Sequence, residues 1–268
     1  MDKCAYLVNS TPKYYYLLEL HFTLVRRYAP FIKHLFLATE VPEDSICQRL
    51  VKEFGVELIP LKVSEAGFLD SRHHALRQLA LSGRFRYVLP MQEDFLLDRV
   101  PDLGALEEAC TIMELSKNYI ASMRLMPCPG PKGPMFESYP LWAGILPTTD
   151  TYGFTFQATL WSLDACCDWY RAICNKLEEE YPLAMTAPDQ RRHIEIRANF
   201  AENPEGQKFF WEFFHDRKQT HLGWIRAGTW PNAVYLSPWP YRPTAIVQGN
   251  LVPWAAEMGE REGVMGQA

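Results

Sequence analysis

The sequence predicts an α/β fold with a mostly parallel central sheet flanked by helices. Short apolar runs alternate with segments of helical spacing up to about residue 95, and short polar connections separate them. Strands that alternate with helices in this way form parallel sheets through right-handed crossovers. The 268 residues are 48% hydrophobic and 22% charged, which is the composition of a globular chain with a substantial core.

Local signals place each strand and helix of the first half. Pro12 opens the first helix, because proline fits the first helical turn. Gly55 ends the second helix. Asp70 or Ser71 caps the third helix, and Gly83 closes it. The strands are expected at residues 5–8, 34–38, 56–61 and 84–89, and the helices at 13–28, 44–54 and 70–81.

The second half is less regular, and its most unusual part is a segment rich in proline and glycine at residues 127–147. A loop of this length in a compact domain is usually a lid or a binding loop. The tail carries many Trp, Tyr and Pro residues and is expected to wrap the sheet. Further helices are expected at 103–117, 164–181 and 189–214, and further strands at 119–125 and 154–163.

Composition argues against several classes of function. The net charge is −5, with both signs mixed along the chain, so no nucleic-acid partner is expected. No apolar stretch approaches the roughly 18 residues of a transmembrane segment, and there is no apolar leader, so we expect a cytoplasmic protein. Its seven cysteines are scattered and odd in number. That pattern predicts reduced, mostly buried thiols rather than a disulfide or zinc framework.

The most informative stretch is Y-V-L-P-M-Q-E-D-F, in which an apolar strand ends in two adjacent carboxylates, Glu93 and Asp94. Pro90 cannot donate a ladder hydrogen bond, so pairing of this strand should stop near Leu89. Gln92 and both acids then lie in the loop beyond the sheet, where open α/β sheets bind ligands. A carboxylate there can hold a divalent cation against a phosphate. An acidic surface turn is the alternative.

Two other predicted strands also end in polar residues. We call the polar residues at the end of each strand its tip, and three such tips are expected to meet at one edge of a parallel sheet. Hydroxyl and backbone donors come from the first tip, and a carboxylate for ribose or base from the second. No G-x-G-x-x-G follows the first strand and no G-x-x-x-x-G-K-[ST] is present, which disfavours Rossmann dehydrogenases and P-loop NTPases. The tips are Asn9-Ser10-Thr11, Thr39-Glu40 and Gln92-Glu93-Asp94.

Arg72 lies in the first turn of the third predicted helix. Its planar guanidinium is suited to a diphosphate, and an exposed helix arginine is the alternative.

The order of these motifs resembles glycosyltransferases of the GT-A fold, which use nucleotide-sugar donors. N-S-T follows the first strand, D-S-R-H-H-A-L-R-Q-L-A precedes the strand that ends in Q-E-D, and F-T-F-Q-A-T-L-W is similar to a Q-A-x-x-W strand of bacterial and viral members. The resemblance implies a single GT-A-like, Rossmann-type domain over residues 1–268. Residues 1–100 would bind the nucleotide, and residues 101–268 would bind the acceptor and wrap the sheet.

The same resemblance implies a UDP- or GDP-sugar donor, a sugar or glycan acceptor, and Mn²⁺ or Mg²⁺. It favours Asp94 as the metal ligand, although Glu93-Asp94 lacks the D-x-D spacing of many members. It also places Gln157 in the sugar or acceptor pocket.

An inverting transfer needs a base for the acceptor hydroxyl. The candidates are Glu205, Glu202 and Glu212, of which Glu205 or Glu202 is favoured. Glu212 is embedded among aromatics in F-F-W-E-F-F, where desolvation would raise its pKa. Glu205 follows a proline at a predicted helix start, where acids also occur because of the helix dipole.

Two other functions fit the same sequence. A nucleotidyltransferase of related fold would also place carboxylates on a metal, but would normally carry a glycine-rich basic loop after the first strand. In a non-catalytic binding module, the acidic residues would lie in solvated turns, and the aromatic tail would form the surface that binds a partner.

Overall fold

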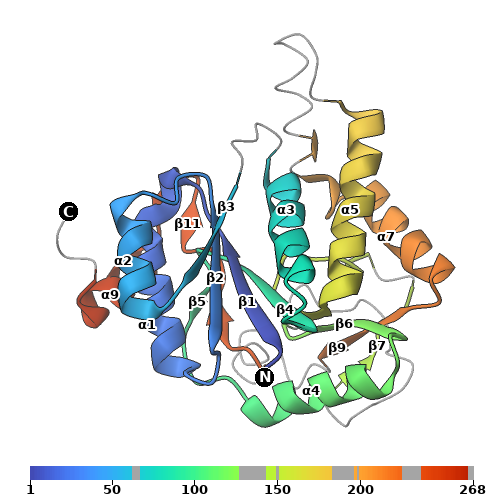
Figure 1. Cartoon of the computed structure of the whole chain (residues 1–268), viewed down its shortest axis with the longest axis horizontal. Helices are drawn as coiled ribbons and strands as arrows, with labels where there is room; N and C mark the ends of the chain where they lie inside the picture. Colours follow the sequence, from blue (N-terminus) through green and yellow to red (C-terminus); the bar gives the residue numbers. More distant parts are fainter. Residues whose placement is uncertain are drawn as a thin grey trace.

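The computed structural model describes residues 1–61, 67–126, 143–148, 151–182, 196–197, 199–224 and 237–264. Within these residues the chain forms an α/β structure around an eight-stranded sheet with the order β3-β2-β1-β4-β8-β6-β9-β7 (Figure 1). The strands are β1 Cys4–Asn9, β2 His34–Thr39, β3 Glu57–Pro60, β4 Tyr87–Gln92, β6 Ile120–Arg124, β7 Ala143–Ile145, β8 Thr159–Ser162 and β9 Thr220–Trp224.

The sheet is mostly parallel, as the sequence predicts. β3, β2, β1 and β4 are neighbours and all run in the same direction. β8 is antiparallel to both β4 and β6, while β6 and β9 are parallel and β7 closes the edge in the antiparallel sense. The carboxyl ends of β1, β2, β3 and β4 therefore lie at one edge of the sheet, which positions the candidate site.

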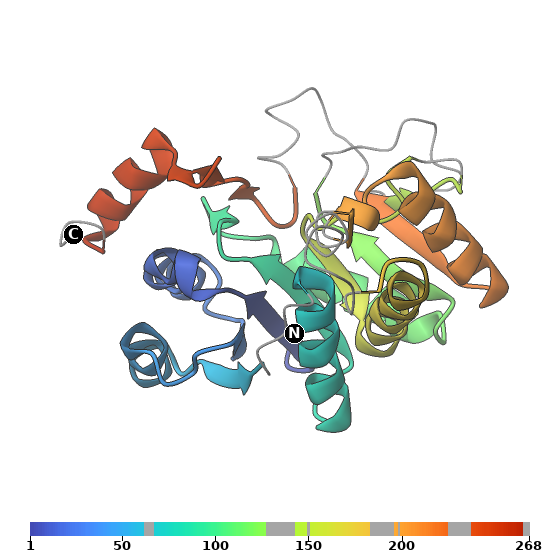
Figure 2. The same cartoon turned by 90° about the horizontal axis from the view of Figure 1, so that it is seen from above.

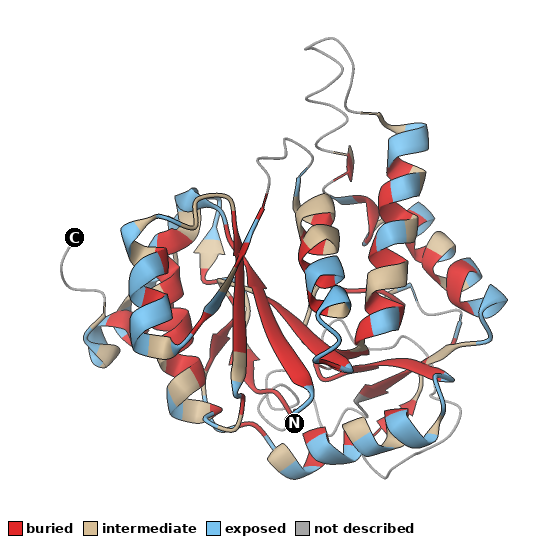
Figure 3. Cartoon of the chain, in the orientation of Figure 1, coloured by how far each residue is buried: buried red, intermediate tan, exposed pale blue. Residues whose placement is uncertain are grey.

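Helices cover both faces of the sheet. The side chains of β1 alternate between the two cores that these helices form with the sheet. Tyr6 and Val8 point into what we call the α1 core, and Ala5 and Leu7 into the α3 core. Figure 3 shows the central strands as almost wholly buried. The α1 core contains residues of α1 Leu18–Tyr28, α2 Ser45–Phe54, α4 Leu103–Leu115 and α9 Pro253–Glu262, and the α3 core contains residues of α3 Phe68–Leu81, α5 Leu163–Glu180 and α7 Pro204–Asp216.

Helix boundaries confirm some local signals and correct others. Asp44 caps α2 by accepting a hydrogen bond from the backbone of Ile46, and Gly55 ends it with φ of 64°. The continuous first helix was a wrong prediction in its first turns, because Pro12–Leu17 forms a 3₁₀ helix, η1, before α1 begins. The cap of α3 at Asp70 or Ser71 was also wrong. Gly67 precedes the helix, whose first turn includes the buried Leu69.

Pro90 does not end its strand, which contradicts the prediction that pairing stops near Leu89. β4 continues to Gln92, with Pro90 opposite Leu7 of β1. On its other side, β4 pairs with β8 only at Tyr87 and Val88. The ladder on that side has ended before Pro90, so the missing N–H breaks no pairing there.

The second half departs most from the predicted boundaries. β8 begins at Thr159, so Gln157 lies in the segment before the strand rather than within it. The predicted loop at 127–147 contains β7 at its end, and residues 127–142 lie outside the described residues. Of the helix predicted at 189–214, residues 189–195 and 198 also lie outside, and α7 accounts for the end of that range.

The tail packs along the α1 side of the sheet, as Figure 2 shows for the red segment that runs to α9. Arg27 of α1 pairs with Glu262 of α9 at 2.6 Å. Among the described residues, no helix is long and apolar enough to cross a membrane. The tail strands are β10 Tyr241–Arg242, which pairs with β5 Leu96–Leu97, and the hairpin of β11 Ile246–Val247 with β12 Asn250–Leu251.

Candidate functional site

The three predicted strand tips do lie side by side. Asn9, the last residue of β1, is in register with Ala38 of β2 and with Gln92 of β4. The backbone N–H of Ser10 continues this pairing by donating to the carbonyl of Ala38 at 3.1 Å. Thr39-Glu40 and Glu93-Asp94 therefore follow directly on either side of β1.

Asn9 is the most unusual polar residue at these tips. It is 4% exposed, and neither its Nδ2 nor its Oδ1 has a hydrogen-bond partner among the described residues. Buried polar groups are nearly always paired, so both amide atoms call for a partner. Leu7 points into the α3 core, so alternation directs Asn9 to the same side of the sheet. An amide in this place has one acceptor and two donors for a ligand.

The other residues of the first two tips are less available. Ser10 is buried, and its hydroxyl donates to the carbonyl of Thr11 at 3.4 Å. Thr39 is fully buried and bonds the hydroxyl of Tyr15. Thr11 is exposed and Glu40 half-buried, so these two can reach a ligand at the edge of the sheet.

Arg72 is buried on the α3 side of the sheet, so the exposed helix arginine is ruled out. It is 2% exposed, and its NH2 group donates to the carbonyl of Met91 at 2.8 Å. Its guanidinium lies 4.9 Å from the ring centre of Phe68, and its Nε has no partner among the described residues. Burial lowers the pKa of Arg72, as expected for a cation in a desolvated place. The bond to Met91 fixes the guanidinium one residue before Gln92.

Glu93 and Asp94 form a half-buried acidic turn after β4. Burial raises the pKa of Glu93 to about 7, an effect that the charge of Asp94 increases and that of Arg72 opposes. Burial also raises the pKa of Asp94 to about 6, although the backbone N–H of Ile246 stabilises its charge. Both carboxylates are therefore short of compensating charge.

The backbone of the acidic turn is held from two sides. His21 of α1 bonds the carbonyl of Glu93 through Nδ1 at 3.1 Å, and the backbone N–H of Ala245 donates to the carbonyl of Asp94 at 3.1 Å. Within the turn, the N–H of Phe95 donates to the carbonyl of Gln92 at 3.2 Å. The two acids thus lie on a fixed backbone.

Gln157 is joined to this turn through the tail. Its Oε1 accepts a hydrogen bond from the hydroxyl of Tyr241, which also accepts from the N–H of Ala158 at 3.1 Å. The ring of Tyr241 lies 5.1 Å from that of Phe95. One tail residue therefore connects the segment before β8 to the acidic turn.

Of the three glutamates considered as a base, Glu202 is the one that contacts the Gln157 segment in the described structure. Its Oε1 accepts from the Thr155 hydroxyl at 3.1 Å and from the N–H of Phe156 at 3.0 Å. Gln207 holds the same segment, because its amide bonds both the N–H and the carbonyl of Phe154. Its Nε2 also donates to the carbonyl of Ala201 at 3.0 Å.

The other two glutamates are exposed, as Glu202 also is. Glu205 is exposed in the first turn of α7, where an acid complements the helix dipole. Glu212 was predicted to be embedded among aromatics, but its side chain is 60% exposed and lies 3.7 Å from Lys208 on the outer side of α7. The run F-F-W-E-F-F gave a wrong prediction of burial, because Glu212 lies on the opposite face of the helix from the buried phenylalanines next to it in the sequence.

The acidic turn has two carboxylates, so a divalent cation bound there would need further oxygen ligands from a bound molecule and from water. Among the described residues, no three His, Cys, Asp or Glu side chains converge as metal ligands. Mg²⁺ is commonly bound by one or two carboxylates, with phosphate and water supplying the other oxygens. Glu93 and Asp94 offer that donor set, and a cation would compensate the charge that burial disfavours.

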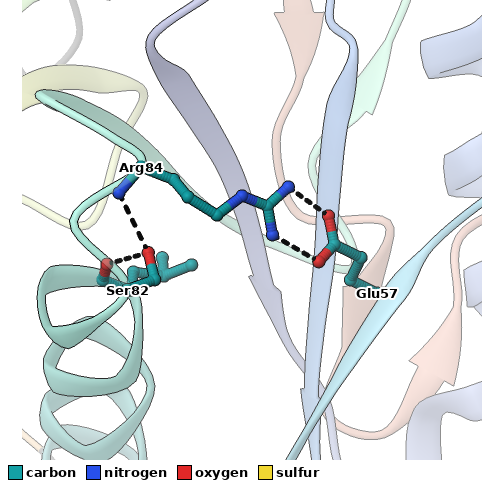
Figure 4. A network of polar contacts seen from close by, with 4 residues as sticks. Glu57, Ser82 and Arg84 are labelled. Carbon is teal, nitrogen blue, oxygen red and sulfur yellow. Dashed lines mark hydrogen bonds and ion pairs between the residues drawn. The ribbon is translucent and has the colours of Figure 1, made fainter.

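A separate cavity of about 560 Å³ lies between β3 and α3. Its apolar walls include Phe36, Ile59 and Leu79. Glu57 and Arg84 also line the cavity and form a bidentate ion pair, with N–O distances of 2.7 and 2.9 Å (Figure 4). Glu57 begins β3, so this pair lies at the opposite end of the strand from the tips.

Sequence reasoning missed His21, Gln207 and Tyr241. His21 interrupts the apolar positions of α1, and Gln207 is a buried amide next to the start of α7, so a polar residue within an apolar pattern was the usable signal. Tyr241 gave no such signal, because the tail is aromatic throughout.

No protein-family model and no curated protein sequence matches the chain.

Proposed function

We propose that the chain is a glycosyltransferase that moves a sugar from a nucleotide-sugar donor to a hydroxyl acceptor, with a GT-A-like arrangement of its sheet. The observation that carries the proposal is the register of Asn9 between the tips of β2 and β4. It brings a buried, unpartnered amide beside the Glu93-Asp94 turn. Such a tip, at the carboxyl ends of parallel strands, is where α/β sheets bind nucleotides.

The residues around the tips offer groups for each part of a nucleotide-sugar. Asn9, Thr11 and Glu40 would face the nucleoside, to which they offer amide, hydroxyl and carboxylate groups. Arg72 would face the diphosphate from the α3 side. Its guanidinium is held by the carbonyl of Met91 and still has an unpartnered Nε–H.

Breaking the bond between sugar and diphosphate requires stabilisation of the negative charge that develops on the leaving group. Asp94 and Glu93 would hold Mg²⁺ or Mn²⁺, which supplies this stabilisation when bound. Burial makes the fixed charge of Arg72 more effective there, because electrostatic interactions are stronger where water is excluded. Glu93 would lose its proton as the cation binds, since metal ligands must be ionised.

Glu202 is the glutamate we assign as the base in an inverting transfer. Its Oε1 is held by Thr155 and the backbone of Phe156, which fixes the carboxylate beside Gln157. Its Oε2 would accept the proton of the acceptor hydroxyl as the acceptor oxygen bonds to the sugar carbon. The nucleoside diphosphate then leaves with the electrons of the broken bond.

The test is a panel of UDP, GDP and their sugars, each with and without Mn²⁺ or Mg²⁺, measured by thermal stabilisation and product analysis. A ligand at 100 times its dissociation constant stabilises by about 2.7 kcal/mol, which raises the melting temperature of a chain of this size by about 5–10 °C. Asp94→Asn is expected to abolish the cation-dependent part of the shift and the transfer. Glu57→Gln is the matched control, since that carboxylate lies at the far end of β3.

Absence of any shift or product with the unmodified protein would refute the proposal. Release of pyrophosphate from a nucleoside triphosphate would indicate a nucleotidyltransferase instead. If the Asp94→Asn variant binds the donor as well as the unmodified protein does, the assignment of Asp94 as the metal ligand is wrong.

A further inference from the structure

His21 is a buried histidine near the start of α1, and it connects α1 with β1 and with the turn after β4. Its ring is 1% exposed. Nε2 lies 2.8 Å from the hydroxyl of Tyr6 in β1, and Nδ1 lies 3.1 Å from the carbonyl of Glu93 after β4. A carbonyl can only accept, so Nδ1 carries the proton in this contact. Nε2 of the neutral ring then accepts from the tyrosine hydroxyl, and the two bonds form one directed chain.

This chain fixes the peptide unit on the N-terminal side of Asp94. The carbonyl of Glu93 and the N–H of Asp94 belong to the same planar unit. The unit on the C-terminal side is held twice, because the carbonyl of Asp94 accepts from Ala245 and the N–H of Phe95 donates to Gln92. With both flanking units held, the Cα–Cβ direction of Asp94 is set by contacts from α1 and from the tail.

We propose that His21 is a positioning residue for the Asp94 carboxylate of the acidic turn, acting through the carbonyl of Glu93, which sets its tautomer, while Tyr6 donates to the other ring nitrogen. The expected effect on cation and diphosphate binding rests on the proposed function. The hydrogen-bond chain itself can be tested without a ligand. Partners that orient metal ligands typically contribute about 10–100-fold to metal affinity. A residue that merely fills the α1 core would contribute to stability alone.

Two substitutions each remove one of the two hydrogen bonds of the imidazole and keep the other. The amide nitrogen of Asn is bonded to Cγ, as Nδ1 is, so His21→Asn retains a donor for Glu93 and loses the acceptor for Tyr6. The amide of Gln lies one carbon further out, so His21→Gln retains an acceptor for Tyr6 and loses the donor for Glu93. Both variants place a neutral amide in the same buried space, so their losses of stability are expected to be similar.

The first measurement is amide hydrogen exchange at residues 93–95 in the ligand-free protein. His21→Gln is expected to speed this exchange about tenfold or more relative to His21→Asn, since the turn loses its anchor. The second is the Mn²⁺ concentration that half-saturates stabilisation by UDP, which should rise about 10-fold or more in His21→Gln and change by less than about threefold in His21→Asn.

Equal exchange at residues 93–95 in the two variants would overturn the positioning role. If UDP and Mn²⁺ do not bind the unmodified protein, the proposed function fails, while the exchange result still decides the role of His21. Should a variant not fold, ¹⁵N NMR of the unmodified protein gives the answer. A neutral ring protonated at Nδ1 supports the assignment, and one protonated at Nε2 overturns it.

Discussion

Glu93 should make the protein less stable as the pH rises, and replacing it with glutamine should remove the effect. Its folded-state pKa is about 7, against an ordinary value of 4.5, mainly because partial burial removes water from the carboxyl. Between these two values the folded state holds a proton that the unfolded state has lost. Unfolding free energy therefore falls as pH rises through this window, and the loss is complete above about pH 7.

The magnitude follows from the two pKa values. A tenfold change in an ionisation constant corresponds to about 1.4 kcal/mol, so full ionisation of Glu93 costs about 3 kcal/mol. The carboxyl is only half-buried, so water screens part of this cost, and we expect about 2 kcal/mol. Glu93→Gln is then more stable than the unmodified protein by about 4–8 °C in melting temperature at about pH 8. At about pH 5 the two should melt within about 2 °C of each other.

The assay is thermal unfolding by circular dichroism in metal-free buffer across that pH range, with urea unfolding at both ends. Glu57→Gln serves as the control, because the ion pair with Arg84 lowers the pKa of Glu57 and reverses the expected sign. A Glu93→Gln variant that is destabilised equally at both pH values would refute the reasoning. It would mean that the carboxylate makes favourable contacts that outweigh its burial.

Three further predictions concern packing and surface charge. Gln207→Leu should lose about 2–4 kcal/mol in urea unfolding, because it leaves the backbone of Phe154 and Ala201 without partners; a loss below about 1 kcal/mol would contradict this. Gly206→Ala should lose about 3 kcal/mol or more, since a Cβ would lie 1.9 Å from the carbonyl oxygen of Phe200. Its control is Gly104→Ala, where the nearest atom is at 3.4 Å and helix propensity favours alanine by up to about 1 kcal/mol. Arg84→Gln should cost less than about 1 kcal/mol, and the cost should vanish in about 1 M salt, because its pair with Glu57 is solvent-exposed; a cost that persists in salt would argue for a packing role.

The sequence by itself determined the order of elements in the first half and the composition of the strand tips. Hydrophobic spacing and helix-ending residues such as Gly55 act within a turn or two of chain, so they can be read locally. The parallel pairing of the first four strands follows from the same alternation. The acidic pair at the end of β4 was also visible, because a carboxylate doublet after an apolar run is a local pattern.

Tertiary structure alone decided which polar groups are buried and what holds them. Whether Pro90 ends a strand depends on how far β8 pairs, and the burial of Arg72 depends on α3 packing against the sheet. His21 and Glu93 are 72 residues apart, and Asp94 depends on the tail at Ala245. Local propensity carries no information about such partners, because their contact arises only when the sheet brings distant segments together. The tips of the sheet are readable from sequence, and the contacts that orient them are not.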